Sequence, residues 1–192
     1  RRSSSSCSAQ PGRSTTSCSR PANNATWPKP SPVAFPIPLK RALPVAIALC
    51  AGVLHALSFA PWALPWLQIL ALASLFALAL RAEHWRAAAL LGFAFGLGWF
   101  GVGVSWVYIS LHVYGLMPAL IAGPATFAFC AFLALYPALA LGAAHVLTVP
   151  PLLRASLALP AAWSLSEWLR GTLLTGFPWL GSGYAQQWNA SV

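Results

Sequence analysis

The sequence predicts an all-α polytopic membrane protein with about five transmembrane helices after a disordered N-terminal tail. Two observations predict this fold. Of the 192 residues, 58% are hydrophobic and only 7% are charged, whereas soluble domains carry about 25% charged residues. The apolar residues also come in successive runs, each approaching or meeting the roughly 20 residues that a helix needs to cross a bilayer. Within lipid, a helix satisfies every backbone polar group of such a run.

The expected helices follow the apolar runs in chain order: about 43–60, 62–80, 87–110, 118–147 and 155–175. Before them, residues 1–41 are rich in Ser, Pro and Arg and contain no acidic residue. This composition predicts disorder. Because the chain begins with Arg1 and not with Met, we interpret residues 1–41 as an extension without a targeting role. Residues 176–192 are expected to form an extracytoplasmic loop.

The flanking charges predict a cytoplasmic N-terminus. In this orientation five of the basic residues near the helix ends lie inside, and only Arg170 lies outside. The five are Lys40, Arg41, Arg81, Arg86 and Arg154. This asymmetry follows the positive-inside rule for membrane proteins.

The small number of acidic residues excludes several kinds of chemistry. Glu83 and Glu167 are the only two, and Asp is absent. A glycosidase carboxylate pair and a Ser-His-Asp triad are therefore excluded, and a Mg²⁺ or Ca²⁺ site is not expected. The four cysteines form no CxxC motif, so neither a zinc site nor a thioredoxin-like site is expected. No metal and no cofactor are expected in this chain. Seven of the eleven basic residues lie before position 42, so no nucleic-acid-binding face is expected.

A few polar and small residues within the apolar runs predict helix contacts. Gly92 and Gly96 form a GxxxG pair, which favours close helix packing. We expect His55, in the middle of the first run, to hydrogen-bond a neighbouring helix. Glu167 and Arg170 are three residues apart and share a helix face. Two interpretations remain open for them: a structural ion pair at the helix end, or a pair that orders the following loop.

Several sequence blocks in a fixed order resemble a known family, the apolipoprotein N-acyltransferases of bacterial inner membranes. The blocks are FAP at 59–61, GFAFGLGWFGVG at 92–103, SWVY at 105–108, EWLRG at 167–171, TGFPWL at 175–180 and GY-x-Q at 183–186. The resemblance covers about residues 42–187, and residues 1–41 have no counterpart in it.

The resemblance implies an enzyme of lipoprotein maturation. Such enzymes transfer a fatty acyl chain from a phospholipid donor to the N-terminal amine of the diacylglyceryl cysteine of an apolipoprotein. It further implies a nitrilase-like extracytoplasmic domain after the helices, with Glu, Lys and Cys as catalytic residues. Nucleophilic catalysis of this kind divides one difficult acyl transfer into two easier steps.

No catalytic residue is expected within these 192 residues. Glu167 matches the EWLRG block of the membrane part, and no Lys follows Lys40. This chain alone is therefore expected to be inactive. Both substrates reach such an enzyme laterally through the bilayer, and the aromatic residues of the matching blocks are candidates for lining their route. These candidates are Trp106, Tyr108, Trp179 and Tyr184.

The alternative from another functional class is a subunit or fragment of a membrane transporter or channel. A transporter would favour charges inside the membrane and internal repeats. The sequence shows no repeat and few charges within the apolar runs.

Overall fold

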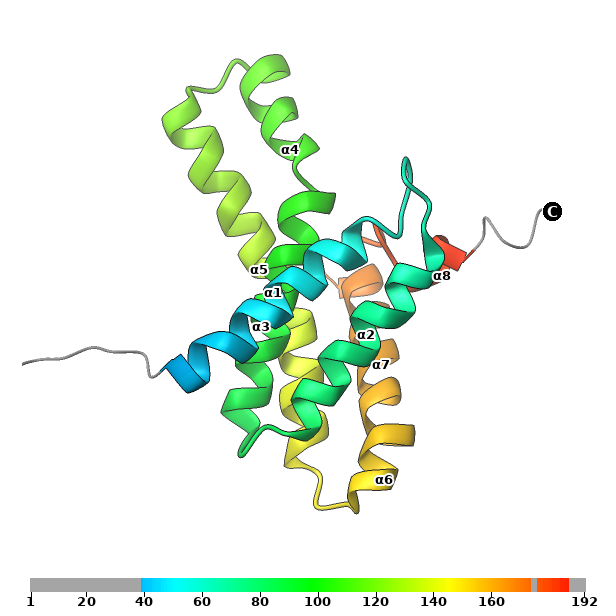
Figure 1. The fold of residues 1–192 in the computed structure, drawn as a ribbon. Coiled ribbons are helices and arrows are strands. Elements are labelled where there is room, and N and C mark those ends of the chain that lie inside the picture. Colours follow the sequence, from blue (N-terminus) through cyan, green and yellow to red (C-terminus); the bar gives the residue numbers. More distant parts are fainter. Residues whose placement is uncertain (1–38, 174–175, 187–192) are drawn as a thin grey trace, which may run out of the picture. The chain divides into compact units, whose positions relative to one another are not determined.

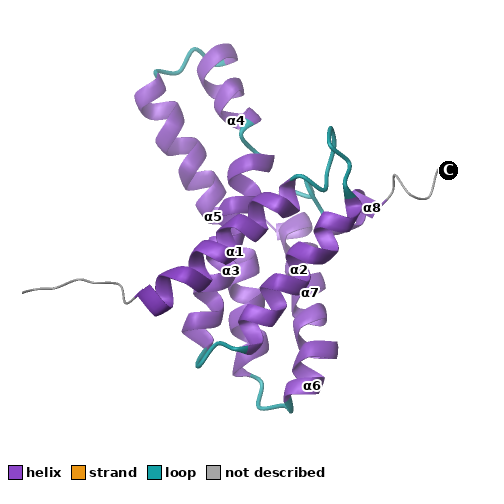
Figure 2. Cartoon of the chain, in the orientation of Figure 1, coloured by secondary structure: helices purple, strands orange, loops and turns teal. Residues whose placement is uncertain are grey.

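A computed structural model describes residues 39–173 and 176–186, and these belong to one compact unit. Figures 1 and 2 show that the described residues form helices joined by short loops, without a strand among them. The predicted all-α class is therefore confirmed. The tail expected at 1–41 lies outside the described residues up to residue 38.

The elements are, in chain order, α1 (Leu39–Ala56), α2 (Pro65–Leu80), α3 (Trp85–Gly103), α4 (Trp106–Ile109), the π-helix η1 (Ser110–Tyr114), α5 (Ala119–Val146), α6 (Pro151–Leu153), the π-helix η2 (Arg154–Ala158), α7 (Leu159–Thr172) and α8 (Ser182–Gln186). Proline occupies the first position of α2 and of α6. Its fixed φ suits that position, and its missing N–H is not needed there.

Several helix ends differ from the expected ranges, and the largest differences are in α1 and in the third expected helix. α1 begins at Leu39, so the boundary expected at residue 42 falls within its first turns. It ends at Ala56, four residues before the expected end, where the Ser58 hydroxyl donates to the His55 carbonyl at 2.6 Å. The third expected helix is interrupted after Gly103, because Val104 leaves the helical conformation with φ −115° and ψ 11°.

Glycines let α3 pack closely against helices on two sides. A Cβ on Gly98 would meet the backbone carbonyl of Leu49 in α1, and one on Gly96 would meet Ala134 of α5. Gly52 of α1 and Gly92 of α3 lie in equally close contacts with the facing backbones. The close helix packing predicted from Gly92 and Gly96 is present, and the same helix uses further glycines toward α1.

An aromatic cluster fills the space between α1, α3 and α7. Trp99 stacks on Trp163 with ring centroids 5.7 Å apart, and His55 meets the edge of Trp99 at 4.6 Å. Both ring nitrogens of His55 are buried without a hydrogen-bond partner among the described residues. The expectation that His55 bonds a neighbouring helix is therefore wrong. Its contacts are aromatic ones, which also include Phe59 and Phe95.

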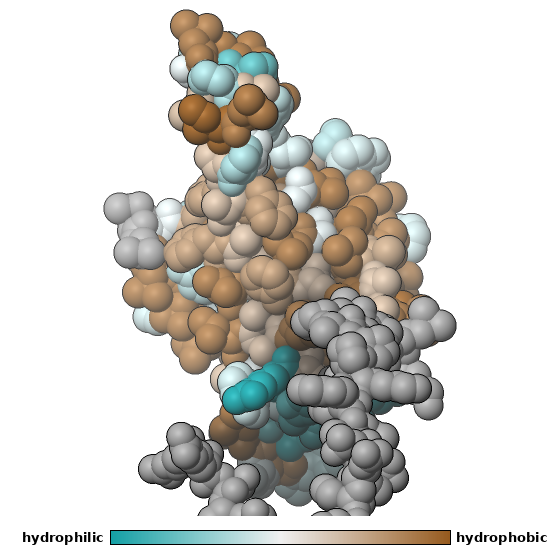
Figure 3. Space-filling view, turned by 90° about the vertical axis from the view of Figure 1, so that its left-hand side faces the viewer, coloured by the Kyte–Doolittle hydropathy of each residue, from teal (hydrophilic) through white to brown (hydrophobic). Residues whose placement is uncertain are grey.

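Many large apolar side chains lie on the outside of the described helices, among them Ile69, Leu120 and Leu139. Figure 3 shows brown and tan residues over most of the middle of the visible face, with the strongest teal toward its lower end. α3 and α5 are long and apolar enough to cross a membrane, whereas Ala42–Ala56 and α2 are shorter apolar helices. At 1.5 Å per residue, α5 is about 42 Å long.

Candidate functional site

The larger of the described cavities lies where three parts of the chain meet, and its volume is about 730 Å³. This volume falls within the range of roughly 300–1,000 Å³ that is typical of small-molecule sites. The lining residues come from the α1–α2 turn, from the end of α3 with the start of α4, and from the segment that precedes α8: Ala56, Phe59, Ala60, Pro61, Trp62, Val102, Gly103, Ser105, Trp106, Pro178, Trp179, Leu180 and Tyr184. We call this cavity the aromatic cavity.

Three of the four aromatic residues singled out in the sequence line the aromatic cavity. Trp106 and Trp179 meet with ring centroids 5.9 Å apart, although 73 residues separate them in the chain. Tyr184 joins them, and about half of each of these three side chains remains exposed. Tyr108 lies elsewhere: it stacks on His112 at 5.4 Å and is not among the lining residues.

Two lining residues that the sequence did not single out as site residues are Phe59 and Trp62. They come from the FAP block and the residue that follows it. The sequence does contain a signal for them, because the FAP motif and the following Trp62 mark the boundary between two apolar runs. The predicted topology places this turn and the segment around Trp179 at the same end of the helices, but the sequence could not show that they line one cavity.

The segment from Gly176 to Gly181, which we call the loop, closes against the end of α3. Leu180 takes a left-handed conformation with φ 59° and packs onto Gly103, where a side chain would collide with it. Gly176 has φ +76°, and a Cβ there would meet the carbonyl of Gly171. Glycine is therefore required at Gly176 for its conformation, whereas Gly103 leaves room for the Leu180 side chain.

Arg170 of α7 binds the loop from within the protein. Its side chain is only 2% exposed, and Nη1 donates to the carbonyl oxygens of Phe177 at 2.7 Å and of Trp179 at 2.6 Å. The guanidinium also lies 5.4 Å from the ring centroid of Trp99 and 5.3 Å from that of Phe100. A buried guanidinium needs such partners, because an unpaired buried charge is strongly unfavourable.

Glu167 binds the residue that begins α8. Its Oε1 accepts a hydrogen bond from the Ser182 backbone N–H at 2.9 Å and one from the Ser182 hydroxyl at 2.7 Å. The same oxygen lies 4.0 Å from Arg170 Nη2, at the outer limit for an ion pair. Glu167 and Arg170 therefore make their short contacts with the chain that follows α7, and not with each other.

Hydrogen bonds also join α2 to α8 at this end of the molecule. Gln68, which is 4% exposed, donates to the Ser182 carbonyl at 2.9 Å, and Gln186 donates to Gln68 Oε1. Trp163 of α7 donates to the Ser182 hydroxyl at 3.3 Å. The sequence carried one signal for this site, because Gln68 is a polar residue within an apolar run.

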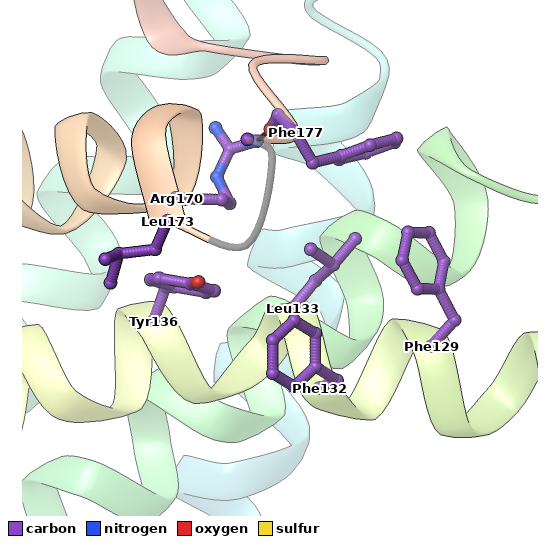
Figure 4. A pocket seen from close by; sticks show the side chains of 8 residues that line it. Phe129, Phe132, Leu133, Tyr136, Arg170, Leu173 and Phe177 are labelled. Carbon is purple, nitrogen blue, oxygen red and sulfur yellow. Dashed lines mark hydrogen bonds between the residues drawn. The ribbon is translucent and has the colours of Figure 1, made fainter.

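A smaller cavity of about 140 Å³ lies between α5 and the loop (Figure 4). Arg170 reaches from α7 toward the backbone of Phe177, and the Phe177 ring extends toward Phe129. Phe129 and Phe177 meet edge to face with centroids 5.3 Å apart. The loop is therefore attached to α5 by apolar contacts as well as to α7 by hydrogen bonds.

A family model and individual relatives both match this chain and agree on its family. Residues 51–192 match the family described as apolipoprotein N-acyltransferase N-terminal domain. A relative named apolipoprotein N-acyltransferase from Ralstonia nicotianae is 51% identical over 158 residues, covering 79% of this chain and 30% of the relative. Relatives of the same name from Methylococcus capsulatus and Nitrosomonas europaea are 44% and 46% identical and cover 73% and 72% of this chain.

The chain spans less than a third of the length of these relatives, since 30%, 28% and 28% of them are covered. The matching region includes all three parts that form the aromatic cavity, together with Glu167 and Arg170. The chain belongs to the apolipoprotein N-acyltransferase family and carries its N-terminal domain.

Proposed function

We propose that residues 42–187 are the membrane portion of an enzyme that transfers a fatty acyl chain from a phospholipid to the N-terminal amine of the diacylglyceryl cysteine of lipoproteins. The observation that carries this proposal is the aromatic cavity, which is formed by blocks of the family sequence that lie far apart in the chain. Family membership favours this function over a transporter or channel.

The membrane portion spans the bacterial inner membrane five times in this proposal, through α1, α2, α3, α5 and the helical residues from α6 to α7. The end of α1, the end of α3 and the loop contribute to one cavity, which supports an antiparallel course of successive helices. At the other end, Trp85 at the start of α3 lies beside Gly142 near the end of α5. The basic residues of the connections at this second end support a cytoplasmic N-terminus.

Cysteine labelling tests this orientation. In a variant without native cysteines, Glu83→Cys places a single thiol at an exposed position before α3, and Tyr114→Cys places one at the exposed end of η1. A membrane-impermeant maleimide added to spheroplasts is expected to label Tyr114→Cys, and to label Glu83→Cys only after permeabilisation. Labelling in the reverse pattern would show that the orientation is inverted.

The aromatic cavity admits lipid acyl chains at the extracytoplasmic boundary of the membrane. Aromatic residues favour that boundary because their rings are apolar and their N–H or O–H groups reach water. The half-exposed rings of Trp106, Trp179 and Tyr184 offer apolar contact to a chain that arrives laterally. Tyr108 was also a candidate, and its position outside the cavity makes it a matched control.

Glu167 and Arg170 order the loop that forms one wall of the aromatic cavity. Their short hydrogen bonds to Phe177, Trp179 and Ser182 support this role over that of an isolated ion pair. Catalysis itself requires groups that these 192 residues do not supply, since no Lys follows Lys40. A polypeptide of these 192 residues alone is therefore expected to form no acyl-thioester from phospholipid.

Photo-crosslinking tests lipid access to the aromatic cavity. A phospholipid with a diazirine near the end of one acyl chain is expected to label peptides that contain residues 56–62, 102–106 or 178–184. The double variant Trp106→Ala with Trp179→Ala should reduce this labelling by about 10- to 100-fold, because losing apolar contact with two rings costs on the order of 1.5–3 kcal/mol. Labelling is quantified by mass spectrometry of the digested protein.

Tyr108→Ala is the control, since it removes an aromatic ring from the same sequence block outside the cavity. It should leave the labelling unchanged. Equal labelling of the double variant and Tyr108→Ala would show that lipids contact the protein without using the cavity.

A further inference from the structure

The residues that line the aromatic cavity fall into two groups by their exposure. One group is exposed, and we call it the rim: Ala60, Pro61, Trp62, Ser105, Trp106, Pro178, Trp179 and Tyr184. The other group is buried or half-buried, and we call it the floor: Ala56, Phe59, Val102, Gly103 and Leu180. One side of the cavity is therefore accessible from outside, and the other side is set into the protein.

The floor and the rim also differ in their chemistry. The floor offers only apolar side chains, whereas the rim carries the indole N–H groups of three tryptophans and the hydroxyl group of Tyr184. The Ser105 hydroxyl of the rim donates to the Val102 carbonyl at 2.9 Å. Among the described residues that line the cavity, none carries a charge. The cavity therefore suits a molecule whose apolar end lies at the floor and whose uncharged polar part lies at the rim.

The aromatic cluster between α1, α3 and α7 closes the floor from within the protein. Phe59 of the floor meets the His55 ring edge to face, with ring centroids 5.7 Å apart, and His55 in turn meets Trp99 at 4.6 Å. His55 is 0% exposed and Trp99 is 1% exposed. Protein interiors are close-packed and leave little space for an additional group. An apolar chain that enters over the rim therefore ends at the floor.

Small side chains set the depth of the floor. Ala56 and Gly103 leave space that larger residues would fill, and Leu180 lies in the space that a side chain on Gly103 would occupy. Ala56 is 4% exposed and belongs to the core. Val102 is half-buried in the last turn of α3, so its side chain can be made smaller or larger with less effect on the core. Val102 is therefore the position at which the depth of the cavity can be tested in both directions.

We propose that the floor receives the methyl end of one phospholipid acyl chain and so limits the length of the chain that the aromatic cavity accepts. The ester end of the same chain then lies at the rim, where indole N–H and tyrosine O–H groups can donate to its carbonyl oxygen. The inference rests on the proposed function, because the cavity must first admit a lipid. It goes beyond that function by assigning acyl-chain selectivity to Ala56, Val102 and Gly103.

Native mass spectrometry of the full 192-residue chain tests this limit, because the mass of a bound lipid reports its chain length directly. The protein is released from detergent micelles that contain an equimolar mixture of phosphatidylethanolamines differing only in acyl-chain length. We expect binding to fall about tenfold beyond one chain length, since a longer chain must displace packed side chains. Val102→Ala removes two carbons and should extend the limit by about two carbons. Val102→Phe adds four carbons and should shorten the limit by about four carbons.

Val107→Ala and Val107→Phe are the matched controls. Val107 is a half-buried valine of α4 that packs against the core, as Val102 does, but it does not line the cavity. Both control variants should keep the chain-length limit of the parent chain. Equal shifts at the two positions would overturn the proposal, as would an unchanged limit in Val102→Ala. Should Val102→Phe fail to fold, Val102→Leu replaces it and should shorten the limit by about one carbon.

Photo-crosslinking at residue level separates this inference from the proposed function. A phospholipid with a diazirine at the methyl end of its chain is expected to label Ala56 and Val102 of the floor, and one with a diazirine beside the ester is expected to label Trp106 and Tyr184 of the rim. Equal labelling of floor and rim by both lipids contradicts the floor alone. Absence of labelling anywhere in the cavity contradicts the admission of lipid on which the inference rests.

Discussion

Arg170→Met is expected to release the loop and to destabilise this end of the molecule by about 3–5 kcal/mol, as is typical when one partner of a buried charged network is removed. Methionine fills a similar volume but donates no hydrogen bond, so the carbonyls of Phe177 and Trp179 lose their donor. Limited chymotrypsin digestion in detergent should then cleave the chain within residues 176–184 at enzyme concentrations that leave the parent chain intact.

Glu167→Gln is the control that separates the two interpretations of the pair. Glutamine keeps an oxygen that can accept from the Ser182 N–H and hydroxyl, but it carries no charge. If loop ordering through hydrogen bonds is the role of the pair, this variant should lose at most about 1 kcal/mol, the usual worth of a partly exposed ion pair. An equal loss of stability in Arg170→Met and Glu167→Gln would show that the ion pair is the essential interaction.

Gly98→Val is expected to separate α1 from α3. The first side-chain carbon would meet the carbonyl of Leu49, and the facing backbone cannot move without displacing α1. Overpacking of this kind costs about 3 kcal/mol, which in a chain of this length lowers the Tm by about 6–12 °C. Thermal unfolding in detergent, followed by circular dichroism, measures the change.

Gly101→Val provides the comparison within the same helix. A Cβ on Gly101 has no atom within 4 Å, so the substitution changes the same residue type without a collision. Its Tm should stay within about 2 °C of the parent value, in line with surface substitutions. A similar loss in both variants would show that α3 requires flexibility and not close approach.

The hydrophobic pattern predicted the helical class, because apolar runs of this length have no other stable conformation in lipid. The same pattern predicted the positions of the helix ends less accurately. The third run appeared continuous to residue 110, but the helix is interrupted after Gly103, where Leu180 packs against it from a distant part of the chain. A contact across 77 positions leaves no trace in local periodicity.

Three of the four aromatic candidates lie at the aromatic cavity, and the fourth does not. The matching blocks predict Trp106, Trp179 and Tyr184 as lining residues, and these three line one cavity. Tyr108 comes from the same block as Trp106 but lies outside it, because α4 turns its side chain toward His112. His55 illustrates the opposite error, since a polar residue type predicted a hydrogen bond and the position is enclosed by aromatic rings.

The roles of Glu167 and Arg170 could not be separated from sequence because their spacing allows an ion pair whatever else they contact. Only the three-dimensional arrangement reveals that Arg170 reaches carbonyls seven and nine residues later and that Glu167 reaches Ser182. Gln68 likewise acquires its partner from α8, more than a hundred residues away.

The most direct test of the proposed function is a chimera. Residues 42–187 replace the matching segment of the Ralstonia nicotianae relative, which is 51% identical over the aligned region. The mass of the N-terminal peptide of a lipoprotein then reports whether its cysteine amine has gained an acyl chain. We expect the chimera to acylate within about tenfold of the rate of the parent relative, a difference of about 1.4 kcal/mol in the barrier, and the 192-residue chain alone to give no product. A chimera that inserts into the membrane at normal levels but transfers no acyl chain would contradict the account.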